Sequence, residues 1–99
     1  MAESVTVGNN LPFVTVIMPV RNEEKYIGSA LDSVLNQQYP PEKLEILVVD
    51  GMSDDSTRQI VEEKRKSGTH LEVLENPGRI VPKAMNIALR RAQGEVIIR

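Results

Sequence analysis

The 99-residue sequence contains no cysteine and no tryptophan, and its only aromatic residues are Phe13, Tyr26 and Tyr39. Without cysteine the chain cannot form disulfides or use thiolate chemistry, which is compatible with a reducing compartment. With so few aromatics, the core must be aliphatic. His70 is the single histidine, so we expect neither a zinc site of the usual ligand spacing nor a Ser-His-Asp triad.

Charge and hydrophobic patterning exclude further classes of protein. The formal net charge is −2 and the basic residues are dispersed, which gives no electrostatic footprint for DNA or RNA. No stretch approaches the roughly 20 apolar residues that span a bilayer. The first ten residues are polar and lack the apolar segment of a secretory signal. The length fits one soluble domain at most.

Short apolar runs alternate with helical apolar stripes along the chain. The runs predict strands at residues 13–18, 44–49, 71–74 and from 95 onward. The stripes predict helices at residues 27–35, around 60–61 and at 81–92. The order βαβαβαβ predicts an α/β, Rossmann-like fold with an open, mostly parallel sheet, right-handed crossovers and helices on both faces. Residues 1–12 are expected to form a flexible arm.

Helix-start chemistry follows the first two strands. We expect Pro19 to end the first strand, because proline cannot donate to the ladder. Asn22 is a candidate N-cap for the helix that follows, and Ser53 or Asp54 for the next helix. Each predicted strand is therefore followed at once by a turn rich in polar side chains.

Acidic residues gather where these two strands end. Glu23 follows the first strand, and Asp50 and Asp54 follow the second. In an open parallel sheet, ligands bind beyond the carboxyl ends of the strands, so we expect these acids to share one crevice. They suit the N–H groups of a base, the hydroxyls of a ribose, or a metal. The alternatives are first-turn acids that complement a helix dipole, or a solvated turn.

Basic residues form a second group of candidates. Arg79 and Lys83 are placed to face a diphosphate, or are exposed charges at a helix start. Arg21 is either solvated or within reach of a phosphate. Asn86, in the same predicted helix, suits a hydrogen-bonding role. A dinucleotide-dependent oxidoreductase is disfavoured, because the turn after the first strand has no glycine before Gly28.

Three motifs in order resemble those of the family 2 glycosyltransferases, which have a GT-A fold and transfer sugars with inversion at the anomeric carbon. Residues 14–23 resemble the family's first strand and its Pro-x-Tyr-Asn-Glu turn. Residues 48–57 resemble its Val-Asp-Asp-Gly-Ser-x-Asp-x-Thr sequence, and residues 76–98 resemble its Asn-x-Gly, Ala-x-Asn and Gly-Glu-x-Ile series. The resemblance implies that residues 13–99 are the nucleotide-sugar-binding portion of a glycosyltransferase domain, truncated at its C-terminal end within the N-terminal half of the GT-A fold.

The resemblance also implies roles for particular residues. Glu23 and Asp50 match positions that hold the base and ribose of the donor, and Pro19 and Val20 match the backbone that lines the base. The complete set implied for nucleotide-sugar binding is Pro19, Val20, Arg21, Glu23, Asp50, Ser53, Arg79 and Lys83. The sequence departs from the family at Arg21, where tyrosine is frequent, and at Gly51 and Met52, where Asp and Gly are usual.

The intact enzyme implied by the resemblance transfers a sugar from a nucleoside-diphosphate sugar to an acceptor hydroxyl, with Mg²⁺ or Mn²⁺. Its metal motif and catalytic base are expected beyond Arg99, so we expect the 99 residues alone to be inactive and to self-associate. The implied location is the cytoplasm or the cytoplasmic face of a membrane. A non-catalytic nucleotide-binding module is the alternative, and the sequence after Arg99 would distinguish the two.

Overall fold

The computed structural model describes residues 11–66 and 70–98, and their element order confirms the predicted alternation of strands and helices. The elements are β1 (Val14–Val20), α2 (Ile27–Leu35), the 3₁₀ turn η1 (Pro41–Lys43), β2 (Leu44–Asp50), α3 (Thr57–Arg65), β3 (Leu71–Glu75), α4 (Val81–Arg91) and β4 (Glu95–Ile98). In these two ranges no helix is long and apolar enough to cross a membrane.

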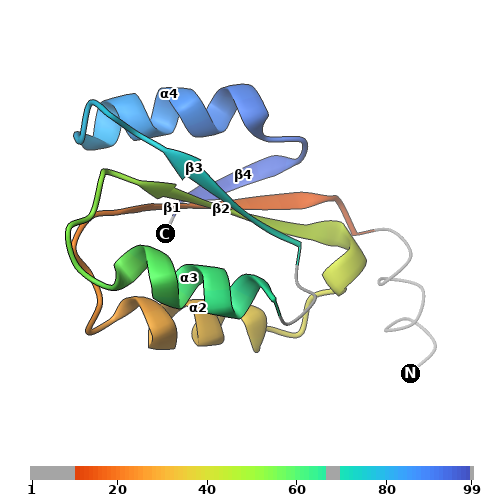
Figure 1. The fold of residues 1–99 in the computed structure, drawn as a ribbon. Helices are drawn as coiled ribbons and strands as arrows, with labels where there is room; N and C mark the ends of the chain where they lie inside the picture. Colours follow the sequence, from red (N-terminus) through yellow and green to blue (C-terminus); the bar gives the residue numbers. More distant parts are fainter. Residues whose placement is uncertain (1–10, 67–69, 99) are drawn as a thin grey trace.

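The four strands form one parallel sheet in the order β3-β2-β1-β4. The long strands β1 and β2 lie at its centre and pair along their whole length, from Val14 opposite Leu44 to Val20 opposite Asp50. The chain passes outward to β3 and then returns across the sheet to place β4 on the other side of β1 (Figure 1). All four strands therefore point their carboxyl ends toward the same edge.

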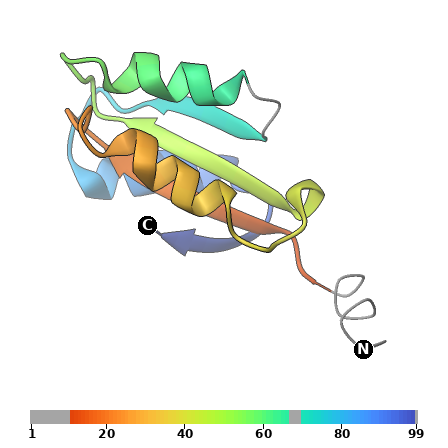
Figure 2. The same cartoon turned by 90° about the horizontal axis from the view of Figure 1, so that it is seen from below.

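Helices cover both faces of the sheet, as the sequence predicts. Successive side chains of a strand point to opposite faces, so Val16 and Val48 pack against α2 and α3, whereas Ile17 and Leu47 pack against α4. Figure 2 shows α2 and α3 side by side on one face with α4 behind the sheet. Only the small residues Ala84 and Ala88 of α4 are fully buried, which lets this helix lie close to β1 and β2.

The prediction that Pro19 ends the first strand is wrong, because β1 continues to Val20. The Val20 carbonyl accepts the Gly51 N–H toward β2. Because backbone groups alternate between the two edges of a strand, the Pro19 nitrogen faces the β4 side. The proline therefore leaves the ladder between β1 and β2 intact, from Val14 opposite Leu44 to Val20 opposite Asp50.

The predicted helix caps are also wrong. Helix α2 begins at Ile27 and α3 at Thr57, after Tyr26 and Ser56, and neither of these N-cap side chains makes a capping bond. Asn22, Ser53 and Asp54 lie upstream of the helices and bond between the two loops instead. Residues 1–10 of the expected arm lie outside the described residues, so its flexibility stays a prediction. The Leu11 carbonyl accepts a bond from Lys43 Nζ at 2.8 Å.

A buried polar cluster joins β1, β2 and the turn before β4, at the end of the sheet away from the carboxyl ends. Thr15 Oγ1 donates to Glu45 Oε2 at 2.7 Å, and the same oxygen accepts the Gln93 N–H at 2.9 Å. The Gly94 N–H donates to Thr15 Oγ1 at 3.0 Å. A Cβ on Gly94 would lie 2.4 Å from the Phe13 carbonyl oxygen. The turn therefore approaches β1 so closely that only glycine fits.

Candidate functional site

A cavity of about 210 Å³ lies at the carboxyl ends of β1 and β2, beside the start of α4. It is lined by Pro19, Val20, Arg21, Glu23, Val49, Gly51, Asn76, Arg79, Ile80, Val81 and Ala84. Five residues that the family resemblance implies for donor binding are on this lining, namely Pro19, Val20, Arg21, Glu23 and Arg79. They come from β1, the loop after it and the loop before α4, so the fold brings together residues up to 60 positions apart in the sequence.

Asp50 lies behind the cavity wall rather than on it. Its side chain is buried, with 2% of the residue exposed. Its carboxylate accepts the Ser53 N–H at 3.2 and 3.3 Å and the Ser53 hydroxyl at 2.5 Å. Gly51, the next residue, occupies the wall position. Asp50 and Ser53 thus organise the turn beneath the cavity, and their direct contact with a donor stays a prediction.

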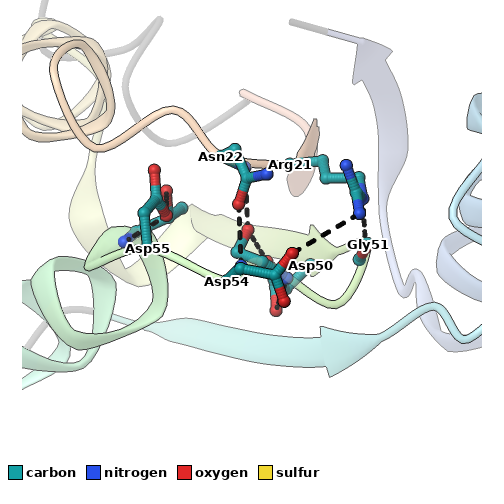
Figure 3. Close-up of polar contacts among 8 residues, drawn as sticks. Arg21, Asn22, Asp50, Gly51, Asp54 and Asp55 are labelled. Carbon is teal, nitrogen blue, oxygen red and sulfur yellow. Dashed lines mark hydrogen bonds and ion pairs between the residues drawn. The ribbon is translucent and has the colours of Figure 1, made fainter.

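Arg21 lies across Gly51. Its Nε donates to the Gly51 carbonyl at 3.0 Å, and its Nη2 lies 3.8 Å from Asp54 Oδ2. A Cβ added to Gly51 would meet the Cβ and Cδ of Arg21 at 3.5 Å. Figure 3 shows the guanidinium held between Gly51 and Asp54. The predicted convergence of Asp54 on the crevice is therefore indirect, because its exposed carboxylate meets Arg21 instead of lining the cavity.

The loops after β1 and β2 cap each other's backbone. Asn22 N–H donates to Ser53 Oγ at 2.9 Å, and Asn22 Oδ1 accepts the Asp54 N–H at 2.7 Å. Glu24 Oε1 accepts the Ser56 N–H at 2.9 Å. Asn22 also has a positive φ of 54°, a conformation that asparagine tolerates better than most residues. These reciprocal bonds fix the loop that carries Arg21 and Glu23.

Thr57 and Asp55 form the centre of this contact between loops. The buried Thr57 hydroxyl accepts the Glu23 N–H at 2.7 Å and donates to Asp55 Oδ1 at 2.5 Å. Burial alone would raise the pKa of Asp55, but hydrogen bonds from the Thr57 hydroxyl and from the backbone N–H groups of Thr57, Glu24 and Asp55 itself lower it below its ordinary value. Both side chains therefore have a structural role in positioning Glu23.

Asn76 is also on the cavity lining, and its role was not predicted from the sequence. It is 2% exposed. Its N–H extends the β2 ladder to the Asp50 carbonyl at 2.8 Å, and its Nδ2 donates to the Ile80 carbonyl at 3.0 Å. Its Oδ1 is buried with no hydrogen-bond partner among the described residues. The signal that would have identified it is an asparagine at a strand end directly before Pro77-Gly78.

Lys83 and Asn86 are not on the cavity lining. Both are exposed on α4, and the Lys83 side chain packs against Gly78, where an added Cβ would lie 2.2 Å from its Cδ. Arg79, in contrast, lines the cavity with a positive φ of 66°. The structure therefore separates the two basic residues that the sequence analysis grouped together.

Two further hollows lie on the described residues. One, of about 340 Å³, lies between the end of β1 and α2 and shares Pro19, Val20 and Glu23 with the cavity, but its lining comes from the end of one strand only. A larger hollow of about 570 Å³ lies over Ser56, Gln59, Ile60, Glu63 and Lys64 on one side of α3. No strand end is among the lining residues of this larger hollow, and ligands of open α/β sheets bind beyond strand ends. We therefore assign the site to the cavity of about 210 Å³ at the ends of β1 and β2. Within residues 11–66 and 70–98, no three His, Asp or Glu side chains are grouped to hold a metal ion.

Solved structures with the same fold carry nucleotides. A mannosyltransferase from Pyrobaculum calidifontis, PcManGT, in complex with GDP-Man and Mn²⁺ superposes with a TM-score of 0.81 at 40% identity, over 86% of this chain and 26% of that one. Residues 1–349 of TarS from Staphylococcus aureus, in complex with UDP, superpose with a TM-score of 0.78 at 40% identity, over 87% of this chain and 26% of that one. The predicted Rossmann-like GT-A fold is confirmed.

Sequence comparison gives the same result. A dolichyl N-acetyl-alpha-D-glucosaminyl phosphate 3-beta-D-2,3-diacetamido-2,3-dideoxy-beta-D-glucuronosyltransferase from Methanococcus voltae is 36% identical over 88 residues, which are 87% of this chain and 27% of that protein. The chain spans 15% of the poly(ribitol-phosphate) beta-N-acetylglucosaminyltransferase TarS, at 40% identity. The family model described as glycosyl transferase family 2 matches residues 15–99. This chain therefore belongs to glycosyl transferase family 2.

Proposed function

We propose that this chain is the donor-binding part of an enzyme that transfers a sugar from a nucleoside-diphosphate sugar to an acceptor hydroxyl, in polysaccharide or glycoconjugate synthesis. The observation that carries the proposal is the cavity at the carboxyl ends of β1 and β2, which five residues of the implied donor site line together. The solved relatives with GDP-Man and UDP support a nucleotide as the occupant.

The cavity offers suitable chemistry for the two ends of a nucleotide. Pro19, Val49 and Ala84 supply apolar walls for a flat base. Arg79 supplies a cation on the lining, where a charge-assisted bond to the diphosphate would stabilise the complex. Glu23 is on the same lining, and we propose that it accepts hydrogen bonds from ribose hydroxyls.

We further propose that the intact enzyme uses Mg²⁺ or Mn²⁺, as the Mn²⁺ complex of the mannosyltransferase supports. The ligands would lie outside the described residues, because those residues contain no group of side chains that fits a metal. A location in the cytoplasm or at the cytoplasmic face of a membrane belongs to the same proposal.

The test is donor turnover by the full-length protein. We expect release of nucleoside diphosphate from at least one sugar nucleotide, and Arg79→Ala should raise the KM for that donor about tenfold, the loss of one charge-assisted bond. The matched control is Arg90→Ala, an exposed arginine of α4 away from the cavity lining. Tight nucleotide binding without turnover of any donor would favour the non-catalytic binding module, and an Arg79→Ala variant that matches wild type would remove the cavity from the donor site.

A further inference from the structure

The cavity wall beside Asp50 carries no acidic side chain. Gly51 is the residue on the lining, and the Asp50 carboxylate is turned away from it and bonded to Ser53. Glycine at position 51 provides no side-chain acceptor on this wall. The polar side chain that fills the space over Gly51 is Arg21.

The guanidinium of Arg21 is held in a defined orientation. Its Nε–H donates to the Gly51 carbonyl, and its stem lies over the Gly51 Cα. Of the five N–H donors of an arginine, this bond uses one. The contact with Asp54 is long, at 3.8 Å, and the Asp54 side chain is 79% exposed, so it competes weakly for the remaining donors. Arg21 is on the cavity lining with four of its N–H donors left, so it can offer a planar fork of donors to an occupant of the cavity.

Such a fork suits a particular kind of nucleobase edge. Two parallel N–H groups bind best to two neighbouring acceptors, as when arginine bonds O6 and N7 of guanine. Cytosine offers a similar pair in O2 and N3. In uracil no two acceptors are neighbours, because an N–H or a C–H lies beside each carbonyl. In adenine the ring acceptors N1 and N7 each lie next to the amino group, which is a donor. Neither base therefore offers two neighbouring acceptors to the two N–H groups of arginine.

We propose that Arg21 determines base selection in this site, favouring guanosine and cytidine diphosphates over uridine and adenosine diphosphates. The inference rests on the proposed function, since it assumes that the cavity holds the base. It assigns Arg21 to the base rather than to the diphosphate, because the bond to Gly51 places its guanidinium at the strand end beside Asp50. Gly51 contributes by leaving room for the arginine stem.

The experiment is calorimetric titration of the full-length protein with GDP, CDP, UDP and ADP. We expect GDP and CDP to bind about tenfold or more tightly than UDP and ADP, the discrimination typical of a bidentate arginine contact. Arg21→Lys keeps the charge but loses the planar fork, so it should bring the four affinities to within about threefold. Gly51→Asp should do the same by pairing its carboxylate with Arg21. The control is Arg65→Lys, whose ion pair with Glu62 lies within α3.

The outcomes separate this inference from the proposed function. UDP or ADP binding as tightly as GDP to the wild type would overturn the base assignment while leaving the donor site in place. A preference that survives Arg21→Lys would overturn the role of Arg21. No binding of any of the four nucleotides would contradict the proposed function itself.

Discussion

Replacing Thr57 with valine tests the contact between the two loops at the site. Valine has nearly the same shape as threonine but lacks the hydroxyl, which accepts the Glu23 N–H at 2.7 Å and donates to Asp55 at 2.5 Å. Thr57 is fully buried, so water cannot replace the lost partner without rearrangement. Leaving a polar group unpaired in such a place costs about 2 kcal/mol. For a domain of this size, that corresponds to a Tm lower by about 8–16 °C.

The assay is thermal or urea unfolding of the chain followed by circular dichroism. Thr57→Ser is the matched control, because it keeps the hydroxyl and loses one buried methyl group, worth about 0.8 kcal/mol. We expect the valine variant to be clearly less stable than the serine variant, and to bind nucleotide more weakly because Glu23 is no longer held. Equal stability of the two variants would refute the claim that the Thr57 hydroxyl fixes the loop after β1.

Three further predictions concern pH, a close approach and association. Hydrogen bonds lower the pKa of Asp55 in the folded state, so the unfolded state binds the Asp55 proton more strongly. Asp55 therefore stabilises the fold above about pH 4, and this contribution is lost as the pH falls through the folded pKa. Asp55→Asn should flatten the acid side of a plot of stability against pH, and an unchanged plot would contradict this. Gly94→Ala should speed amide exchange in β4, since the added Cβ would lie 2.4 Å from a backbone oxygen of Phe13. Gly28→Ala is the control and should not change this exchange, because its Cβ would meet only Ile60 at 3.7 Å. Equal effects of the two substitutions would refute the close approach of Gly94 to Phe13. The 99-residue chain should self-associate through uncovered apolar surface, so a sharp monomer in light scattering at high concentration would count against that prediction.

The fold was predictable because its determinants are local. Continuous apolar runs mark strands that are covered on both faces, and Ala84 and Ala88 mark the buried side of α4 by their spacing. The placement of helices on both faces then follows from the handedness of parallel crossovers, whereas the strand order β3-β2-β1-β4 was not predicted. The expectation for Pro19 is wrong because the tolerance of a strand for proline depends on which neighbour its nitrogen faces, and the sequence does not show that this nitrogen faces away from β2.

The site was only partly predictable because its polar side chains bond across the chain. Asn22 and Ser53 have the residue types of helix caps, yet they bond each other's loops, 31 positions apart. Asp50 and Gly51 are adjacent in sequence, and only the backbone direction at the end of β2 decides which one faces the cavity. Asn76 acts through a buried amide whose partner is the Ile80 carbonyl. Such relations become visible only once the strand ends are assembled.

The most direct test of the donor site is hydrogen exchange of the full-length protein, followed by mass spectrometry, with and without saturating nucleoside diphosphate. The account predicts slower exchange in peptides that cover residues 19–24, 50–54 and 76–81, which line or support the cavity, and unchanged exchange over α3. Protection confined to residues 56–64, around the larger hollow on α3, or protection nowhere in this chain, would contradict the assignment of the cavity as the nucleotide site.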